Sequence, residues 1–209
     1  MSFDLPKLYP ITDRRLSGLS HAEQVARLSD GGACVVQLRE KHLSPREFYR
    51  EAEEALRVAR ARGVRLVIND RADIALALGA DSVHLGQDDM PPGAARSLLG
   101  DKAIIGFSTH SIEQAARAAR LPVDYVAIGP VFATSSKENP DAAVGLEGVA
   151  RVRESVGQIY VVAIGGINEE NARAVLDAGA DSVAVISALL APRDPSEITL
   201  RVRRFLDRL

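Results

Sequence analysis

The sequence is poor in cysteine. It contains a single one, Cys34, among 209 residues, so no internal disulfide can form. This scarcity fits a reducing compartment, and we expect a cytoplasmic protein. Because Cys34 lies inside the apolar run GGACVVQL, we expect it to be a buried structural thiol and not a catalytic nucleophile.

An excess of charge of either sign is also missing. The formal net charge is −2 and the pI is near 6.1, so no global field attracts nucleic acid or a membrane surface. No apolar run approaches the ~20 residues of a membrane helix, and the start MSFDLPKLYPITD contains no leader-like segment. We therefore expect no nucleic-acid or membrane partner. The composition, 46% hydrophobic and 26% charged, predicts one globular domain over residues 1–209.

Short β-branched runs alternate with amphipathic helical stretches along the whole chain, which is typical of βα units and a parallel sheet. The strands number about the eight that a closed barrel requires. An open doubly wound sheet is the main alternative, but it usually carries a glycine-rich fingerprint after its first strand, and residues 10–15 contain none. The sequence therefore predicts the α/β class and a single (β/α)8 TIM barrel. The expected strands are residues 7–12, 33–38, 65–69, 82–85, 103–107, 125–128, 159–164 and 182–186.

Helix starts are marked by N-cap residues, each followed three positions later by a glutamate or glutamine. This spacing satisfies the first free N–H groups of a helix and fixes where it begins. The expected caps are Ser20, Ser44, Ser111 and Asp194.

The segment VVQLREK, residues 35–41, carries the clearest sign of function. Its apolar run leads into Gln37, Arg39 and Lys41 at alternate positions, and alternate side chains of a strand share one face. A guanidinium fork beside an ammonium suits a phosphorylated or diphosphorylated ligand. The alternative is a solvated strand end whose cations pair with nearby acids such as Glu40.

Acidic residues follow the third and fourth expected strands, at the end where a barrel has its active site. Asn69 and Asp70 end one strand, and Asp89 lies in the segment HLGQDD after the next. Two carboxylates across a barrel mouth would suit Mg²⁺, which completes its shell with water and substrate phosphates. The alternatives are an N-cap role for Asp70 and a turn role for Asp88 or Asp89 before Pro91.

Small hydroxyl residues and glycines follow the last three strands. The loop GPVFATSSK contains Thr134, Ser136 and Lys137, which suit a phosphate but also fit an ordinary mobile surface loop. Gly166, in AIGGI, lets a ligand approach the backbone closely. Residues 186–189 open a helical turn whose free N–H groups can face the mouth. The sequence thus predicts two separate anion sites.

The histidines give only weak signs of acid–base catalysis or zinc binding. His110, in GFSTH next to Ser108, is the only tempting general base, although a histidine just before an N-cap is more often structural. We expect His84 to line the barrel, because no second His or Cys stands at zinc-ligand spacing. The sequence also lacks a Ser/His/Asp order or a reactive Cys/His pair for covalent catalysis.

Taken in order, these motifs resemble those of the thiamine phosphate synthase (thiamine-phosphate pyrophosphorylase) family. The resemblance runs over nearly the whole chain, through YPITD, QLREK, INDRADIALALGADSVHLGQDDMP, GFSTH, GPVFATSSK, AIGGI and VISAL. It implies a transferase that joins 4-amino-2-methyl-5-hydroxymethylpyrimidine diphosphate to 4-methyl-5-(2-hydroxyethyl)thiazole phosphate, or to its carboxylated form. The products would be thiamine phosphate and pyrophosphate, formed by Mg²⁺-assisted dissociative loss of the diphosphate.

The same resemblance implies a role for each site residue. Asp70 and Asp89 would bind the cofactor, Mg²⁺. The residues expected to act in catalysis are Arg39, Lys41, Ser108 and Lys137. Those expected to hold the diphosphate and the pyrimidine are Gln37, Arg39, Lys41, Asn69, Ser108 and Lys137. Those expected to hold the thiazole phosphate are Thr134, Ser136, Gly166, Ile186 and Ser187.

Two other functions stay open. A related thiazole tautomerase shares the fold and can carry a histidine at the position of His110, but it has no diphosphate to ionise. A non-catalytic barrel that binds thiamine phosphate would leave the paired acids, Asp70 and Asp89, unexplained. The sequence also leaves open whether the chain forms a homo-oligomer.

Overall fold

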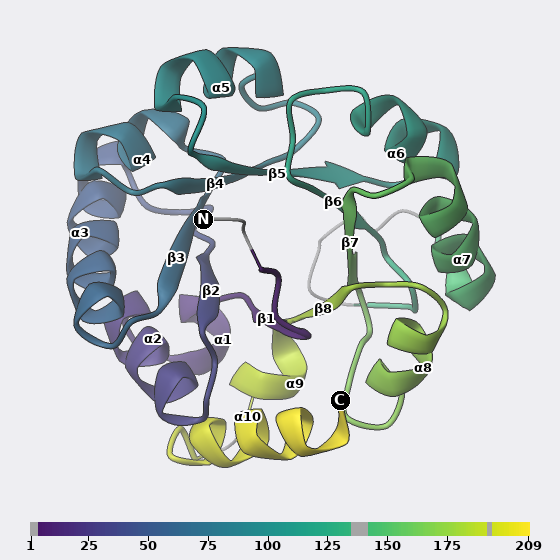
Figure 1. Cartoon of the computed structure of the whole chain (residues 1–209). Coiled ribbons are helices and arrows are strands. Elements are labelled where there is room, and N and C mark those ends of the chain that lie inside the picture. The colour runs from purple at the N-terminus through teal and green to yellow at the C-terminus, as the bar shows by residue number, and fades with distance from the viewer. Residues whose placement is uncertain (1–3, 135–141, 192–193) are drawn as a thin grey trace.

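The chain folds into a ring of strands surrounded by helices (Figure 1). The structure, a computed structural model, describes residues 4–134, 142–191 and 194–209. Its strands are β1 Leu8–Pro10, β2 Val35–Leu38, β3 Arg65–Asn69, β4 Ser82–Leu85, β5 Ile104–Thr109, β6 Tyr125–Ile128, β7 Tyr160–Ile164 and β8 Ser182–Val185. Its helices are α1 Arg14–Ser17, α2 His21–Asp30, α3 Pro45–Ala61, α4 Ala72–Leu78, α5 Pro92–Leu99, α6 Ile112–Ala118, α7 Gly145–Val156, α8 Ala172–Asp177, α9 Ser187–Leu190 and α10 Glu197–Arg208.

The strands form the barrel in chain order. Each strand from β2 to β8 pairs in parallel with the next, and β8 pairs with β1. The joint between β1 and β2 is short, because Ile11 forms only an isolated bridge with Gln37. The N–H of Thr12 then donates to the Gln37 carbonyl at 2.9 Å. This arrangement confirms the predicted (β/α)8 TIM barrel, whose active-site face is formed by the C-terminal ends of the strands.

The first strand is shorter than predicted. Residues 7–12 were expected, but the strand covers only Leu8–Pro10. Beyond Pro10 the chain divides its hydrogen bonds between two neighbours, because Ile11 donates to Val185 and Thr12 donates to Gln37. The end of β1 therefore ties β8 to β2 instead of extending one regular ladder.

Three of the four expected helix starts are confirmed. Ser20 and Ser44 each form a complete capping box, and Ser111 accepts the N–H of Gln114. The fourth was wrong, because Asp194 accepts the N–H of Ser196 in a turn and α10 begins only at Glu197. Within the described residues, no helix is long and apolar enough to cross a bilayer.

Apolar side chains form two layers, one inside the barrel and one between the barrel and its helices. Val35 and Val67 belong to the inner cluster, whereas their neighbours Val36 and Ile68 belong to the outer one. This alternation follows from the period of two along a strand. The layers hold the strand ends rigidly and so fix the positions of the side chains at the mouth.

A glycine makes room for Tyr125, one of two tyrosine side chains buried inside the barrel. Gly106 on β5 pairs with Tyr125 on β6, and the Tyr125 ring occupies the space where a side chain at position 106 would lie. A Cβ atom placed on Gly106 would be 2.0 Å from Cζ of Tyr125. Tyr125 is fully buried and stacks on His84 with ring centroids 5.5 Å apart. Gly106 is therefore required by packing.

A chain of polar groups crosses the barrel interior beneath the mouth. The Gln37 amide donates to the Tyr9 hydroxyl at 3.3 Å, and the Tyr9 and Tyr125 hydroxyls are 2.7 Å apart. His84 continues the chain, with Nδ1 at 3.0 Å from the Tyr125 hydroxyl and Nε2 at 2.8 Å from Oγ of Ser108. Among the described residues, no buried polar side-chain atom is left without a partner. This chain forms the floor of the mouth.

The expectation that Cys34 is buried was wrong. Its side chain is exposed. The strand begins one residue later, at Val35, and Ala33 and Val35 on either side are both buried. Because neighbouring side chains of an extended segment point to opposite sides, Cys34 points away from this apolar packing. An apolar run in the sequence therefore need not bury every residue that it contains.

Replacing Gly106 by alanine should lower the free energy of unfolding by about 1–3 kcal/mol, because the new methyl group would overlap the Tyr125 ring. Urea unfolding followed by circular dichroism measures this change. Gly93→Ala is the matched control, since a Cβ on that helical glycine has no atom within 4 Å. Equal stabilities for Gly106→Ala and the parent protein would contradict this packing argument.

The buried His84 should also make stability depend on pH. Burial lowers the pKa of His84 from 6.5 to about 4. Between these values the unfolded chain binds a proton that the folded protein does not, so stability decreases as the pH falls. Between pH 6.5 and about pH 4, this difference in proton binding lowers the free energy of unfolding by about 3 kcal/mol.

Urea unfolding between pH 7 and pH 4.5 tests this prediction. The parent protein should lose stability more steeply than His84→Gln, whereas His42→Gln, which changes an exposed histidine, should follow the parent. Parallel curves for the parent and His84→Gln would show that His84 does not titrate as described.

Candidate active site at the barrel mouth

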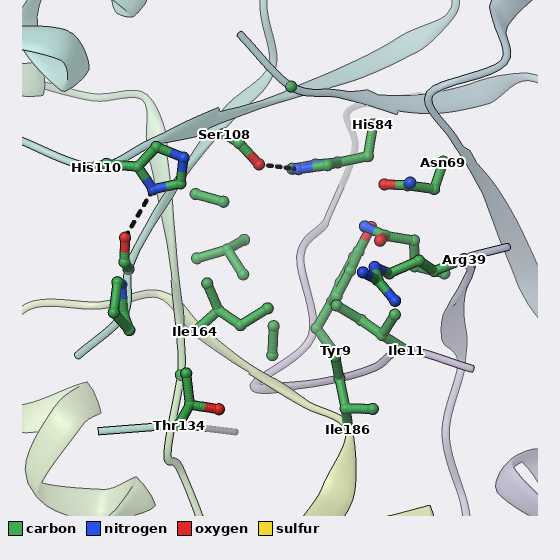
Figure 2. Close-up of a pocket in the computed structure, with 18 of the residues that line it drawn as sticks. Tyr9, Ile11, Arg39, Asn69, His84, Ser108, His110, Thr134, Ile164 and Ile186 are labelled. Carbon is green, nitrogen blue, oxygen red and sulfur yellow. Dashed lines mark hydrogen bonds between the residues drawn. The ribbon is translucent and has the colours of Figure 1, made fainter. Parts of the chain in front are cut away.

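A cavity of about 600 Å³ opens at the C-terminal ends of the strands (Figure 2). Residues on or directly after every strand line it, from Tyr9 on β1 to Ala184 on β8. Figure 2 shows Arg39 and Asn69 on one side of this cavity, with His110 and Thr134 across from them. The cavity therefore lies where a barrel of this type is expected to have its active site.

The cavity gathers every sequence-predicted site residue that the structure describes. From the first half of the barrel come Gln37, Arg39, Lys41, Asn69, Asp70 and Asp89. From the second half come Ser108, Thr134, Gly166, Ile186 and Ser187. Ser136 and Lys137 lie outside the described residues. The roles assigned to all of these residues stay predictions.

The strand end after β2 supplies the cationic side of the cavity. Gln37 lies on the strand and is buried, whereas β2 ends at Leu38, so Arg39 and Lys41 follow just beyond it. The strict alternation expected for a strand thus ends before the two cations. All three polar side chains nevertheless line the same cavity.

Each of these cations lies near an acid. Nη1 of Arg39 is 3.8 Å from Oδ2 of Asp13, and the Lys41 ammonium pairs with Asp70. Both cations remain partly exposed toward the cavity. Glu40, which the alternative interpretation paired with them, does not line this cavity and bonds to a buried histidine instead.

Two carboxylates lie side by side at the ends of β3 and β4. Burial raises the pKa of Asp89, and a hydrogen bond with the Asp70 carboxyl raises it further. Asp70 has a φ of 63°, a left-handed conformation that costs roughly 1–2 kcal/mol for a residue other than glycine. Such strain is typical of a functional position.

The structure bears on the alternative roles of these acids. Asp70 does not cap α4, because the N-cap position is occupied by Arg71 and has no side-chain hydrogen bond. Asp89 does serve a turn, since its Oδ2 accepts the Gly86 N–H at 2.6 Å. The Asp89 carboxyl thus bonds both to this turn and to the Asp70 carboxyl.

The acid pair fits a divalent cation with few protein ligands. Among the described residues, no group of three His, Cys, Asp or Glu side chains could hold a metal ion. Two adjacent carboxylates whose negative charges oppose each other are nevertheless enough for Mg²⁺, which keeps several waters and takes substrate phosphate oxygens. Asp70 and Asp89 are therefore the residues that would hold it.

Ser108 and His110 form the wall contributed by β5. Ser108 bonds through Oγ to His84, and its carbonyl accepts the Gln87 amide at 2.5 Å. Nδ1 of His110 lies 2.9 Å from the Gly129 carbonyl, so this nitrogen carries the proton (Figure 2). His110 thus lines the cavity in a fixed orientation, as the structural interpretation expected, and its catalytic role stays undecided.

The opposite wall is made of backbone and small side chains. Gly165 and Gly166 have φ values of 103° and 66°, and a Cβ on Gly166 would lie 2.6 Å from the Ala133 carbonyl. The loop that follows β6 therefore leaves no room for a side chain at these glycines, independently of any ligand. Ser187 begins α9, a single turn that follows β8.

Sequence reasoning missed the aromatic floor of the cavity. Tyr9 and Tyr125 line it, are buried, and link Gln37 to His84 by hydrogen bonds. The alternation of side chains along β1 and β6 could have shown that each tyrosine points into the barrel. That signal alone does not show which tyrosines meet across a barrel.

Comparisons with known proteins agree with this geometry. Residues 8–189 match the family described as thiamine monophosphate synthase. A thiamine-phosphate synthase from Chloroflexus aurantiacus is 46% identical over 198 residues, which cover 94% of this chain and 91% of the relative. One from Clostridium novyi is 49% identical over 189 residues, covering 90% and 92%.

A solved structure gives the same result. The thiamine phosphate pyrophosphorylase from Pyrococcus furiosus superposes with a TM-score of 0.85 at 39% identity, covering 97% of this chain and 94% of the other. Both fold and sequence are therefore shared over nearly the whole length. The chain belongs to the thiamine monophosphate synthase family and is an enzyme of the transferase class.

Proposed function

We propose that the enzyme condenses 4-amino-2-methyl-5-hydroxymethylpyrimidine diphosphate with 4-methyl-5-(2-hydroxyethyl)thiazole phosphate, or its carboxylated form, to give thiamine phosphate and pyrophosphate. One observation carries the proposal: the cations Arg39 and Lys41 meet the acid pair Asp70 and Asp89 at the rim of one cavity. Cations and a divalent-metal site side by side match the charge of a diphosphate. The proposal includes the expectation that residues 1–209 act as one catalytic domain.

The diphosphate would bind at the cationic rim. Arg39 offers a planar fork for its terminal oxygens, and Lys41 can turn from Asp70 toward the ligand. Mg²⁺ held by Asp70 and Asp89 would neutralise charge on the leaving diphosphate oxygens. These groups stabilise charge as it develops on the leaving group, which is where preorganised electrostatics lowers a barrier most.

The pyrimidine would occupy the interior of the cavity above the tyrosine floor. Gln37, Asn69 and Ser108 point polar groups at this space, and apolar side chains such as Val162 line the rest. Loss of the diphosphate leaves a pyrimidine-stabilised cation at the methylene carbon. The cavity walls would hold that cation beside the second substrate, so that the thiazole nitrogen can attack it.

The second substrate would lie on the glycine side. The Gly166 backbone, Ile186 and Ser187 line that wall, and Thr134 lies in the loop beside it. Together with Ser136 of the same loop, they would hold the thiazole phosphate and aim its nitrogen at the methylene carbon, whereas Lys137 would hold the diphosphate. No general base is needed, because the attacking nitrogen carries a lone pair.

The decisive measurement is pyrophosphate release from purified protein with both substrates, with Mg²⁺ and with EDTA in its place. We expect release only when metal and both substrates are present, matched one to one by thiamine phosphate after chromatographic separation. Absence of both products in the complete mixture would overturn the proposal. A tautomerase assay on the thiazole carboxylate phosphate, with His110→Ala beside the parent, would then be the next step.

The metal assignment can be tested separately. Asp89→Asn keeps an oxygen for the Gly86 N–H but removes the charge, so the Mg²⁺ concentration for half-maximal rate should rise by about tenfold or more. Asp101→Asn, an exposed aspartate in the turn before β5, is the control and should leave that concentration unchanged. An unaltered Mg²⁺ dependence in Asp89→Asn would remove Asp89 from the metal site.

A further inference from the structure

A buried histidine links the end of β1 to the segment that carries the cations. His21, the first residue of α2, has no exposed side-chain surface, and Glu40 is nearly as buried. Nδ1 of His21 lies 2.8 Å from Oγ of Thr12, and Nε2 lies 3.3 Å from Oε2 of Glu40. None of the three residues lines the mouth cavity. The function proposed above leaves this cluster unused.

The hydrogen bonds of the cluster are consistent with one proton arrangement. Oγ1 of Thr12 accepts the Arg39 N–H at 3.2 Å and donates its own hydrogen to Nδ1 of His21, because the Glu40 carboxylate at Nε2 can only accept. Nε2 then carries the imidazole proton and donates it to Glu40. Burial lowers the pKa of His21, although the neighbouring Glu40 opposes this effect, so the imidazole is neutral as the arrangement requires.

The cluster fixes the backbone at the point where β2 ends. The Thr12 hydroxyl takes the Arg39 N–H, and Glu40 uses its second oxygen to accept the His42 N–H at 2.7 Å. Glu40 is thus bonded to the imidazole directly, Arg39 is linked to it through Thr12, and His42 is linked to it through Glu40. The N–H of His21 itself reaches Oε2 of Glu51 on α3 at 3.4 Å, which secures the helix start.

Side-chain packing alone does not fix the position of residues 39–43. A second hollow of about 310 Å³ lies against the same segment, between residues 39–43 and residues 13–20. Side chains therefore do not fill the space on that side of residues 39–43. The hydrogen bonds of His21 and Thr12 hold the backbone of this segment at Arg39 and Glu40, whereas Leu43 packs against the core at its far end.

We propose that His21 is a positioning residue, which holds the segment of Arg39 and Lys41 in the conformation that binds the diphosphate. This inference rests on the function proposed above. It predicts that changes at His21 affect the pyrimidine diphosphate selectively, because the thiazole phosphate binds on the opposite wall. A merely structural role would instead alter stability, or the kinetics of both substrates alike.

The test compares KM for each substrate and the inhibition constant of Mg²⁺-pyrophosphate. His21→Phe fills the same space without either hydrogen bond, and we expect KM for the pyrimidine diphosphate and the pyrophosphate constant to rise about tenfold. KM for the thiazole phosphate should stay within about twofold. His21→Gln places an amide near the Nε2 position and should recover most of the loss. His42→Gln, an exposed histidine of the same segment, should behave as the parent protein.

Arg39→Ala separates failure of this inference from failure of the proposed function. Suppose that Arg39→Ala raises KM for the diphosphate, whereas His21→Phe does not and is shown by circular dichroism to be folded. The positioning role of His21 is then overturned, and the proposed function stands. If neither does, the diphosphate assignment fails and the inference fails with it.

A further variant keeps the test decisive if His21→Phe does not fold. Thr12→Val removes the hydroxyl that links His21 to the Arg39 N–H. Thr12→Val should then raise KM for the pyrimidine diphosphate about tenfold and leave KM for the thiazole phosphate within about twofold, because it breaks the link between His21 and Arg39. An unchanged KM for the diphosphate in Thr12→Val would overturn the proposal.

Discussion

The closure of the barrel between β1 and β2 is the constraint on which the site depends. Seven of the strand junctions are regular ladders, whereas this one relies on the Ile11–Gln37 bridge and the hydrogen bond from Thr12 to Gln37. A closed sheet has no free edge, and its strand ends meet around one opening. Because β1 and β2 meet there, the Tyr9 hydroxyl lies beneath Gln37, and the Thr12 hydroxyl lies beside the backbone of Arg39. The junction thus shapes both the floor and the cationic rim of the cavity.

The interior of this barrel is polar as well as apolar, and the balance suits an ionisation reaction. Tyr9, Tyr125 and His84 satisfy one another by hydrogen bonds, so they can be buried without a large desolvation cost. They present hydrogen-bonding groups and no net charge to the interior of the cavity. The formal charges lie at the rim, on Arg39 and the acid pair. The proposed reaction needs this separation, because the charge that moves is on the leaving group.

Sequence reasoning reached the fold and the location of the site for a common reason. Alternating strands and helices imply a parallel barrel, and the ends of its strands converge, so the residues after each strand could be gathered from the sequence. Arg39, Asp70 and Ser108 are far apart in the chain and line one cavity for this reason. Contacts across the barrel could not be found in this way. The Tyr9–Tyr125 bond joins residues 116 apart and depends on which side chains share a layer, and the cluster around His21 depends on how α2 lies against the end of β2. Cys34 shows the same limit. The sequence does not tell that β2 begins at Val35, so it does not tell that the thiol before it faces outward.

The backbone at Asp70 restricts how this position can vary. A left-handed residue is tolerated readily only by glycine and, less so, by asparagine and aspartate. Of these, only aspartate also brings a negative charge to the acid pair and to Lys41. Glutamate would conserve the charge but would strain the turn, whereas glycine would relax the turn but lose the carboxylate. Local conformation and site chemistry thus favour the same residue independently, so a replacement of Asp70 costs either the charge or the backbone conformation of the turn after β3.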